Sequence, residues 1–289
     1  MARDPAAQTA FGPMVQVAIE QYEPPGRRLV DDDLARAILP AGQRALVGAL
    51  RVSPLRRLTV SAGERSVPGA WALITCRKRF IDDKLAAALD DVDTVVILGA
   101  GMDTRGYRLA RRSGVPVFEV DLPVNIARKK AALQRIGKVP ESLHLVAVDF
   151  ERDDLFASLA RHGLQSDARS FFVMEGVTQY LAEEAVAATF AALETAAAGS
   201  RLVFTYVRKD FIDGRNTYGA ELLYKRFRQR RQVWKFGIEP GDVADFIAEY
   251  GWTLVEQAGP DYYQKHYLNP AGRDLAASEL EWAVHAEKV

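Results

Sequence analysis

Residues 94–105 constrain the fold more than any other stretch, because they join a buried-strand pattern to a glycine turn. The first five residues are rich in β-branched side chains, Gly99 and Gly101 follow, and helical spacing then begins. An apolar run with an abrupt end is typical of a buried parallel strand. Glycine adopts torsions closed to other residues and lets a ligand approach the main chain. The stretch predicts the nucleotide-binding corner of a doubly wound sheet, with Asp103 or Thr104 as the helix N-cap.

The turn departs from the dinucleotide fingerprint G-x-G-x-x-G, because Thr104 stands where the third glycine belongs. Asp103 also places a negative charge near the helix start, where a pyrophosphate would bind. These residues argue against NAD and favour S-adenosylmethionine, whose sulfonium is positive. An ordinary tight turn between a strand and a helix, without a ligand, is the alternative.

The composition excludes several classes of protein. Apolar residues make up 48% of the 289-residue chain, and 38 basic residues balance 38 acidic ones, so no overall field favours nucleic acid or an anionic membrane. The basic run 225–231 indicates a solvated helix face rather than an anion site. The single cysteine, Cys76, excludes an internal disulfide. Without a secretory signal, a spanning segment or a His/Cys cluster, we expect a cytoplasmic protein with no structural metal.

The first 68 residues have no strand pattern. Apolar residues recur at helical spacing in three short pieces, 11–22, 34–39 and 42–50. Each piece is amphipathic and must pack on something larger. We therefore expect residues 1–68 to form a helical cap over the ligand edge of the sheet.

One longer helix is expected over residues 69–89, and it carries Arg77 and Arg79. Two arginines just before the glycine-turn strand could bind a carboxylate through paired hydrogen bonds. The alternative is a pair of exposed arginines that keep the helix soluble.

Two further strands end in acid. Residues 116–121 end at Asp121, which lies 22 positions after Gly99, the spacing at which an acidic residue meets a ribose hydroxyl pair. Asp121 could instead only cap the helix predicted from Pro123. The next strand, 143–150, ends in Asp149 and Phe150.

Asp149 could accept a hydrogen bond from an adenine amino group, and Phe150 could pack on the ring; an Asx turn is the alternative. A fourth strand, 171–174, ends at Glu175, outside the carboxyl edge of the sheet where ligands of doubly wound sheets bind. A carboxylate there would be an electrostatic partner for a sulfonium.

The rest of the chain completes an α/β domain. Helices are expected at 123–136, 153–161, 181–198 and 240–250, and strands at 201–207, 252–257 and 280–288. Because the last strand follows its predecessor without an expected helix between them, it should pair antiparallel. We predict one domain over 1–289, with a cofactor-binding core (69–207), an aromatic and basic insertion lining the substrate pocket (208–238), and the end of a seven-stranded sheet (239–289).

Three motifs in order resemble the leucine carboxyl methyltransferase family: Ile97-Leu98-Gly99-Ala100-Gly101-Met102-Asp103-Thr104-Arg105, Phe118-Glu119-Val120-Asp121-Leu122-Pro123 and Glu175-Gly176-Val177-x-x-Tyr180-Leu181. The similarity covers roughly residues 20–210. It is to the bacterial branch, with actinobacterial S-adenosylmethionine-dependent methyltransferases and polyketide O-methyltransferases of the tetracenomycin type. Residues 77–83 and 28–32 resemble further motifs of this branch, with Lys78 where it usually has threonine.

The resemblance implies a Rossmann-like methyltransferase fold and a role for each matching residue. Arg77, or Arg79 in its place, would hold the methionine carboxylate. The remaining implied cofactor contacts are Gly99 and Gly101 at the methionine part, Asp121 at the ribose, Asp149 and Phe150 at adenine, and Glu175 beside the amino group or sulfonium.

We therefore predict an S-adenosylmethionine-dependent O-methyltransferase that acts on a carboxylate or hydroxyl of a small molecule, such as a polyketide-like secondary metabolite. A carboxylate acceptor is ionised near neutral pH and needs no base, whereas a phenol with a pKa near ~10 would benefit from one. His266 is the candidate base. The alternatives are a methyltransferase of protein C-terminal carboxylates, a nicotinamide-dependent reductase, and a methyltransferase fold that only binds a partner.

Overall fold

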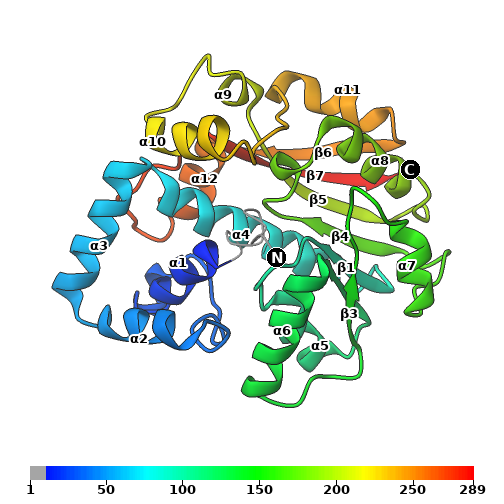
Figure 1. The fold of residues 1–289 in the computed structure, drawn as a ribbon, viewed down its shortest axis with the longest axis horizontal. Coiled ribbons are helices and arrows are strands. Elements are labelled where there is room, and N and C mark those ends of the chain that lie inside the picture. Colours follow the sequence, from blue (N-terminus) through cyan, green and yellow to red (C-terminus); the bar gives the residue numbers. More distant parts are fainter. Residues whose placement is uncertain (1–10) are drawn as a thin grey trace.

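A computed structural model describes residues 11–289, in which a group of N-terminal helices lies beside a seven-stranded sheet (Figure 1). The first ten residues of the predicted cap lie outside this described part. The helices of the cap are α1 (Gly12–Glu20), the short 3₁₀ turn η1 (Pro25–Arg27), α2 (Ala41–Ala49) and α3 (Ser53–Ser66).

The sheet has the strand order β3-β2-β1-β4-β5-β7-β6. Its strands are β1 (Thr94–Leu98), β2 (Val117–Asp121), β3 (Leu143–Ala147), β4 (Ser170–Met174), β5 (Arg201–Val207), β6 (Trp252–Ala258) and β7 (Glu281–Lys288). Strands β1 to β5 pair in parallel, whereas β7 lies antiparallel to both β5 and β6. The Rossmann-like sheet of seven strands with a reversed last strand is therefore confirmed.

The remaining helices connect these strands. They are α4 (Ala70–Ala88), α5 (Arg105–Ser113), α6 (Pro123–Ile136), α7 (Leu155–Arg161), η2 (Thr178–Tyr180), α8 (Glu183–Glu194), α9 (Lys209–Ile212), α10 (Glu221–Tyr224), η3 (Lys225–Arg230), η4 (Pro240–Asp242), α11 (Val243–Ala248), α12 (Pro260–Tyr263) and η5 (Gln264–Leu268). The short helices α12 and η5 stand between β6 and β7, where we expected none. They do not carry the chain across the sheet, so β7 still returns antiparallel.

Side chains that alternate between the two faces of the sheet divide the interior into two hydrophobic cores. In β1, Val95 and Ile97 join the core beneath α4, whereas Val96 and Leu98 join the core beneath α7, α8 and α11. Side chains of a strand point alternately to opposite faces, so a strand buried on both faces must be apolar throughout. All five residues of β1 are buried. The apolar run at residues 94–98 is therefore a central strand of the sheet.

Two parts of the cap differ from the prediction. Residues 34–39 form turns rather than a helix, because six residues bounded by Pro40 are too short for a stable helical ladder. The helix α3 was not anticipated, since its residues are mostly exposed and lack a clear apolar stripe. Among the described residues, no helix is long and apolar enough to cross a membrane.

The fold predicts a loss of stability in mild acid through His285 of β7. Burial, followed by the charges of Lys84 and Arg201, lowers the pKa of His285 to about 4 from 6.5. Between pH 4 and pH 6.5, His285 is protonated in the unfolded chain and neutral in the folded chain. The free energy of unfolding should therefore fall as the pH drops from 6.5 towards 4. In urea titrations at several pH values, His285→Gln should show a shallower fall than the wild type. Parallel curves would contradict this assignment.

Candidate active site

The sheet order places the acid-tipped strands side by side. Strands β3, β2, β1 and β4 are consecutive neighbours, so the residues that follow them form a row at the carboxyl edge. In spatial order this row is Asp149, Asp121, the glycine corner at Gly99 and Gly101, and Glu175. Three strand spacings amount to about 14 Å. Strands β2 and β4 lie on opposite sides of β1, so the strand order reverses its direction at β1. The row of residues crosses this point of reversal, which is where doubly wound sheets bind their ligands.

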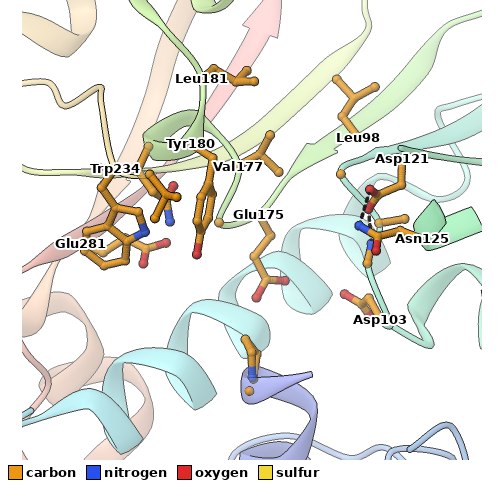
Figure 2. A pocket seen from close by; sticks show the side chains of 18 of the residues that line it. Leu98, Asp103, Asp121, Asn125, Glu175, Val177, Tyr180, Leu181, Trp234 and Glu281 are labelled. Atoms are coloured by element: carbon orange, nitrogen blue, oxygen red, sulfur yellow. Dashed lines mark hydrogen bonds between the residues drawn. The ribbon is translucent and has the colours of Figure 1, made fainter. Parts of the chain in front are cut away.

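A cavity of about 730 Å³ runs along this row. It is lined by residues from the strand tips, from α1 and α4 of the cap side, and from the segment after η3. Figure 2 shows Asp103, Asp121 and Asn125 on one side of Glu175, and Tyr180, Trp234 and Glu281 on the other. The cavity therefore has two halves that meet at Glu175. We call them the strand-tip half and the aromatic half.

The glycine corner has the backbone that its sequence predicts. Gly99 and Gly101 have φ angles of +67° and +46°, which side chains rarely allow. A Cβ on Gly99 would lie 2.3 Å from Cγ2 of Val177, so no other residue fits there. Thr104 is the N-cap of α5, although its hydroxyl donates to Asp32 of the cap (2.6 Å) rather than capping the helix.

Asp121 holds this corner in place. Its Oδ2 accepts a hydrogen bond from the backbone N–H of Gly101 (2.6 Å). Its Oδ1 accepts from Leu122 N (2.7 Å) and from Asn125 Nδ2 (2.8 Å). The side chain is 7% exposed and lines the cavity. A carboxylate oxygen has capacity for a second donor, so Asp121 can serve both the corner and the hydroxyls of a ligand.

A buried group of charges surrounds the middle of the cavity. Arg77 of α4 donates through Nε to Glu175 (3.0 Å) and through Nη1 to Glu281 (2.6 Å). Lys78 bridges Glu175 and Asp103, with both distances at 3.1 Å. Arg105 adds bonds to Asp103 (2.6 Å) and Glu175 (3.3 Å).

This arrangement keeps the carboxylates ionised. Burial alone would raise the pKa of the Glu175 carboxyl, but the cations around it, Lys78 first, hold that pKa below its usual range. Against the same burial, Arg105 and then Lys78 hold the pKa of Asp103 well below its usual range. The carboxylates of the site are therefore ionised at ordinary pH and paired with Arg77, Lys78 and Arg105. Our sequence argument treated Asp103 as a free charge, which was wrong, because it is paired with two cations.

The other predicted site residues divide clearly. Asp149 and Phe150 line the far end of the strand-tip half. Arg79 lies outside the cavity lining, where its half-exposed guanidinium pairs with Asp83 one helical turn on. His266 is also outside the lining, and its ring stacks on Tyr262 with centroids 4.3 Å apart. Geometry thus favours Arg77 over Arg79 and gives His266 no access to a ligand in this cavity.

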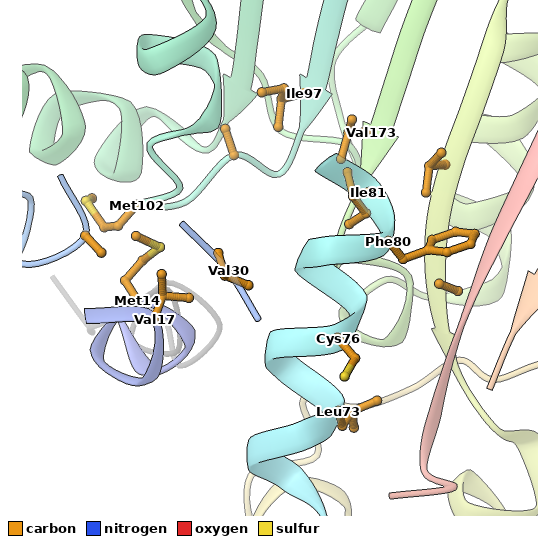
Figure 3. Packing of buried hydrophobic residues seen from close by; sticks show 14 of the residues in the cluster. Met14, Val17, Val30, Leu73, Cys76, Phe80, Ile81, Ile97, Met102 and Val173 are labelled. Atoms are coloured by element: carbon orange, nitrogen blue, oxygen red, sulfur yellow. The ribbon is translucent and has the colours of Figure 1, made fainter. Parts of the chain in front are cut away.

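The cap lines the cavity on the α1 side. Figure 3 shows Met14 and Val17 of α1 at the same end of the core as Met102 of the glycine corner. Asp32 is buried, and besides Thr104 it accepts a bond from Leu34 N (3.0 Å). Through these contacts the cap is fixed to the turn that shapes the site.

Sequence reasoning missed Lys78 and Glu281 as cavity residues. Lys78 carried one signal, because it replaces the threonine that the family pattern usually has. Glu281 lies 204 positions after its partner Arg77, and no local pattern connects the two. Trp234, by contrast, belongs to the insertion 208–238 that the sequence analysis assigned to the substrate pocket, and it lines the cavity.

The sheet order and the reversed β7 are those of an S-adenosylmethionine-dependent methyltransferase. The model of the family "Leucine carboxyl methyltransferase" matches residues 10–194. The chain belongs to the leucine carboxyl methyltransferase family, as the motifs predicted. Membership of this family excludes the alternative function that the sequence analysis had left open, a nicotinamide-dependent reductase.

The relatives agree. A protein of Mycolicibacterium paratuberculosis (strain ATCC BAA-968 / K-10), provisionally named as an S-adenosyl-L-methionine-dependent methyltransferase, is 34% identical over 248 residues, 79% of each chain. One from Mycobacterium tuberculosis (strain ATCC 25177 / H37Ra) with the same provisional name is 30% identical over 258 residues, 85% of this chain and 73% of its own. A solved methyltransferase, also provisionally named, from Thermobifida fusca shares the fold with a TM-score of 0.58 at 16% identity, covering 87% of this chain and 92% of its own.

Proposed function

We propose that S-adenosylmethionine binds along the row of strand tips, with its adenine at Asp149 and Phe150 and its ribose hydroxyls at Asp121. The residues fit this cofactor in shape and charge. Gly99 and Gly101 both line the cavity, so the main chain of the glycine corner is within reach of a ligand. A row of about 14 Å is long enough for a nucleoside joined to an amino acid.

The methionine end of the cofactor would lie at the buried charges. Arg77 is fixed by Glu175 and Glu281 and can still bind the methionine carboxylate, because a guanidinium has five N–H donors. Glu175 would face the amino group or the sulfonium. The low pKa of Glu175 supports this role, because the carboxylate stays charged. Arg79 has no comparable support, since it lies outside the lining.

We propose that the methyl group passes to an oxygen, a carboxylate or a hydroxyl, of a small molecule held in the aromatic half. The observation that carries this proposal is the continuation of the cavity past Glu175 into a chamber lined by Tyr180, Phe227 and Trp234. A cleft of several hundred Å³ with mostly apolar walls is typical of small-molecule sites. A single methyltransferase domain that includes cap and insertion would enclose both ligands.

The protein's own contribution would be orientation and exclusion of water. When bound, the cofactor supplies an electrophilic methyl group on sulfur. Asp121, Arg77 and the glycine corner would fix one reactant, and the aromatic half would fix the other. Holding two reactants at contact distance can contribute roughly 7–11 kcal/mol to the lowering of a barrier. The cap, anchored through Asp32 and Met14, covers the cavity and would keep water out.

Partition of a labelled methyl group tests the acceptor class. The protein is incubated with S-adenosylmethionine carrying a tritiated methyl group and an extract that contains both metabolites and proteins. We expect label in the small-molecule fraction, dependent on active protein, with an Asp121→Ala variant as the blank. Label confined to the protein fraction would instead indicate a protein carboxylate acceptor, and no transfer would contradict the proposal.

A further inference from the structure

The lining of the aromatic half contains aromatic side chains that pack on one another. Trp234 stacks on Phe227 with ring centroids 5.2 Å apart, and Tyr180 meets the Trp234 ring edge-on at 6.3 Å. Elsewhere in the cavity, Leu181 and Met14 add apolar surface to the lining. Aromatic walls favour ring systems, because stacked and edge-to-face contacts add to the burial of area.

The cations of the lining are already matched by carboxylates. Arg77 pairs with Glu175 and Glu281, and Lys78 pairs with Asp103 and Glu175. At the rim, Lys235 lies 3.2 Å from Glu151. Arg152, whose side chain is 81% exposed, lies 3.7 Å from Asp149. The remaining donors of Arg77 are assigned to the methionine carboxylate, so a carboxylate on the acceptor would find no further unmatched cation in the lining and would meet the negative charge of Glu281.

Three buried polar atoms at this end of the cavity have no hydrogen-bond partner in the described part of the chain: Oε1 of Glu281, Oε1 of Gln179 and Nε1 of Trp234. These residues are 4%, 3% and 7% exposed, and all three line the cavity. A buried polar group without a partner costs about 1–3 kcal/mol. Two of the three atoms are hydrogen-bond acceptors, so a ligand that donates hydrogen bonds would satisfy most of this group.

We infer that the methyl acceptor is an uncharged aromatic molecule bearing a hydroxyl group, and that Oε1 of Glu281 receives the proton of that hydroxyl. This inference rests on the proposed function and chooses between its two acceptor groups. The acceptor oxygen forms its bond to the methyl carbon as the sulfur–carbon bond breaks and leaves its electron pair on sulfur. The hydroxyl proton passes to Glu281, whose Oε2 is held by Arg77 Nη1 at 2.6 Å so that Oε1 stays fixed in direction.

A matched pair of probes tests this inference by binding alone. Calorimetry measures 1-naphthol, which is neutral at pH 7, and 1-naphthoate, which is anionic, against protein saturated with S-adenosylhomocysteine. We expect naphthol to bind at least about tenfold tighter than naphthoate, a difference of about 1.4 kcal/mol. Equal affinities, tighter naphthoate or no binding of naphthol would overturn the inference. Failure of the protein to bind S-adenosylhomocysteine at all would instead overturn the proposed function.

A charge-neutral variant tests the part played by Glu281. Glu281→Gln should raise the affinity for naphthoate about tenfold, since the anion is no longer repelled, and should lower that for naphthol, since an amide oxygen accepts a hydrogen bond more weakly than a carboxylate. Glu279→Gln is the matched control, because Glu279 is half-exposed, pairs with Arg208 and lies outside the lining. An unchanged naphthol-to-naphthoate ratio in Glu281→Gln would contradict the role of Glu281. If this variant fails to fold, the ratio in the wild type still decides the acceptor class.

The bond that is formed gives an independent readout. Methyl esters release methanol in alkali, whereas aryl methyl ethers do not. Tritium transferred by the wild type to small molecules should therefore survive alkali treatment. Release of the label as volatile methanol would show a carboxylate acceptor and overturn the inference while leaving methyl transfer to oxygen intact.

Discussion

Replacing Asp121 with alanine is expected to weaken the binding of S-adenosylhomocysteine at least about 100-fold while the protein stays folded. The carboxylate is proposed to accept hydrogen bonds from the two ribose hydroxyls. Hydrogen bonds to a charged group contribute about 1.5–3 kcal/mol each. The substitution also releases the N–H of Gly101, which Asp121 holds at 2.6 Å, so the glycine corner loses its anchor. Isothermal titration calorimetry measures the affinity, and circular dichroism checks the fold.

Asp93 provides the matched control. It lies just before β1, at the opposite edge of the sheet, where it forms an exposed ion pair with Arg169 at 3.1 Å. Exposed pairs of this kind contribute about 0–1 kcal/mol to stability. Asp93→Ala should therefore bind S-adenosylhomocysteine like the wild type. If Asp121→Ala also kept wild-type affinity, the ribose role of Asp121 would be wrong.

Replacing Lys129 with methionine is expected to destabilise the protein by about 3–5 kcal/mol, the usual cost of removing one partner of a buried ion pair. Lys129 of α6 and Glu119 of β2 are both fully buried, with 2.7 Å between Nζ and Oε2. Burial raises the pKa of Glu119, so part of the cost would be relieved by uptake of a proton. Thermal unfolding should show a fall in Tm of about 10 °C.

Two further variants isolate this effect. Lys130 is the next residue along α6 and is exposed, so Lys130→Met should leave the Tm almost unchanged. Adding Glu119→Gln to Lys129→Met removes the unpaired charge and should restore much of the lost stability. The explanation fails if Lys129→Met and Lys130→Met melt at the same temperature. Because Lys129 Nζ also donates to the carbonyl of Ala100 (3.3 Å), cofactor affinity should fall along with stability in Lys129→Met.

The sheet could be predicted from the sequence because its signals are local. The apolar run of β1 ends at a glycine whose φ is positive, and β2 ends in the acid expected from the spacing. Each of these patterns spans only a few residues, because it depends on the burial of one strand and on the backbone conformation of one turn. The order of the strands then brought Asp121 and Asp149 to the same cavity without further information.

The charge balance of the site could not be predicted in the same way. Besides the neighbouring Arg105, the cation that pairs with Asp103 is Lys78, 25 positions earlier on α4. The partner of Arg77 in β7 is set by tertiary packing alone. The cap shows the same limit, since residues 34–39 have helical spacing and yet form turns. Ion pairs between distant elements depend on how the whole chain packs, so they cannot be predicted from short sequence patterns.

The central claim is that neighbouring strand tips bind one S-adenosylmethionine between the glycine corner and the cap. A crystal structure of the protein with S-adenosylhomocysteine tests it most directly. We predict the ribose hydroxyls at Asp121, the adenine at Asp149 and Phe150, and the amino-acid carboxylate at Arg77, with the sulfur turned towards Tyr180 and Trp234. A ligand bound elsewhere, or in this cavity with its adenine at Trp234, would contradict the account.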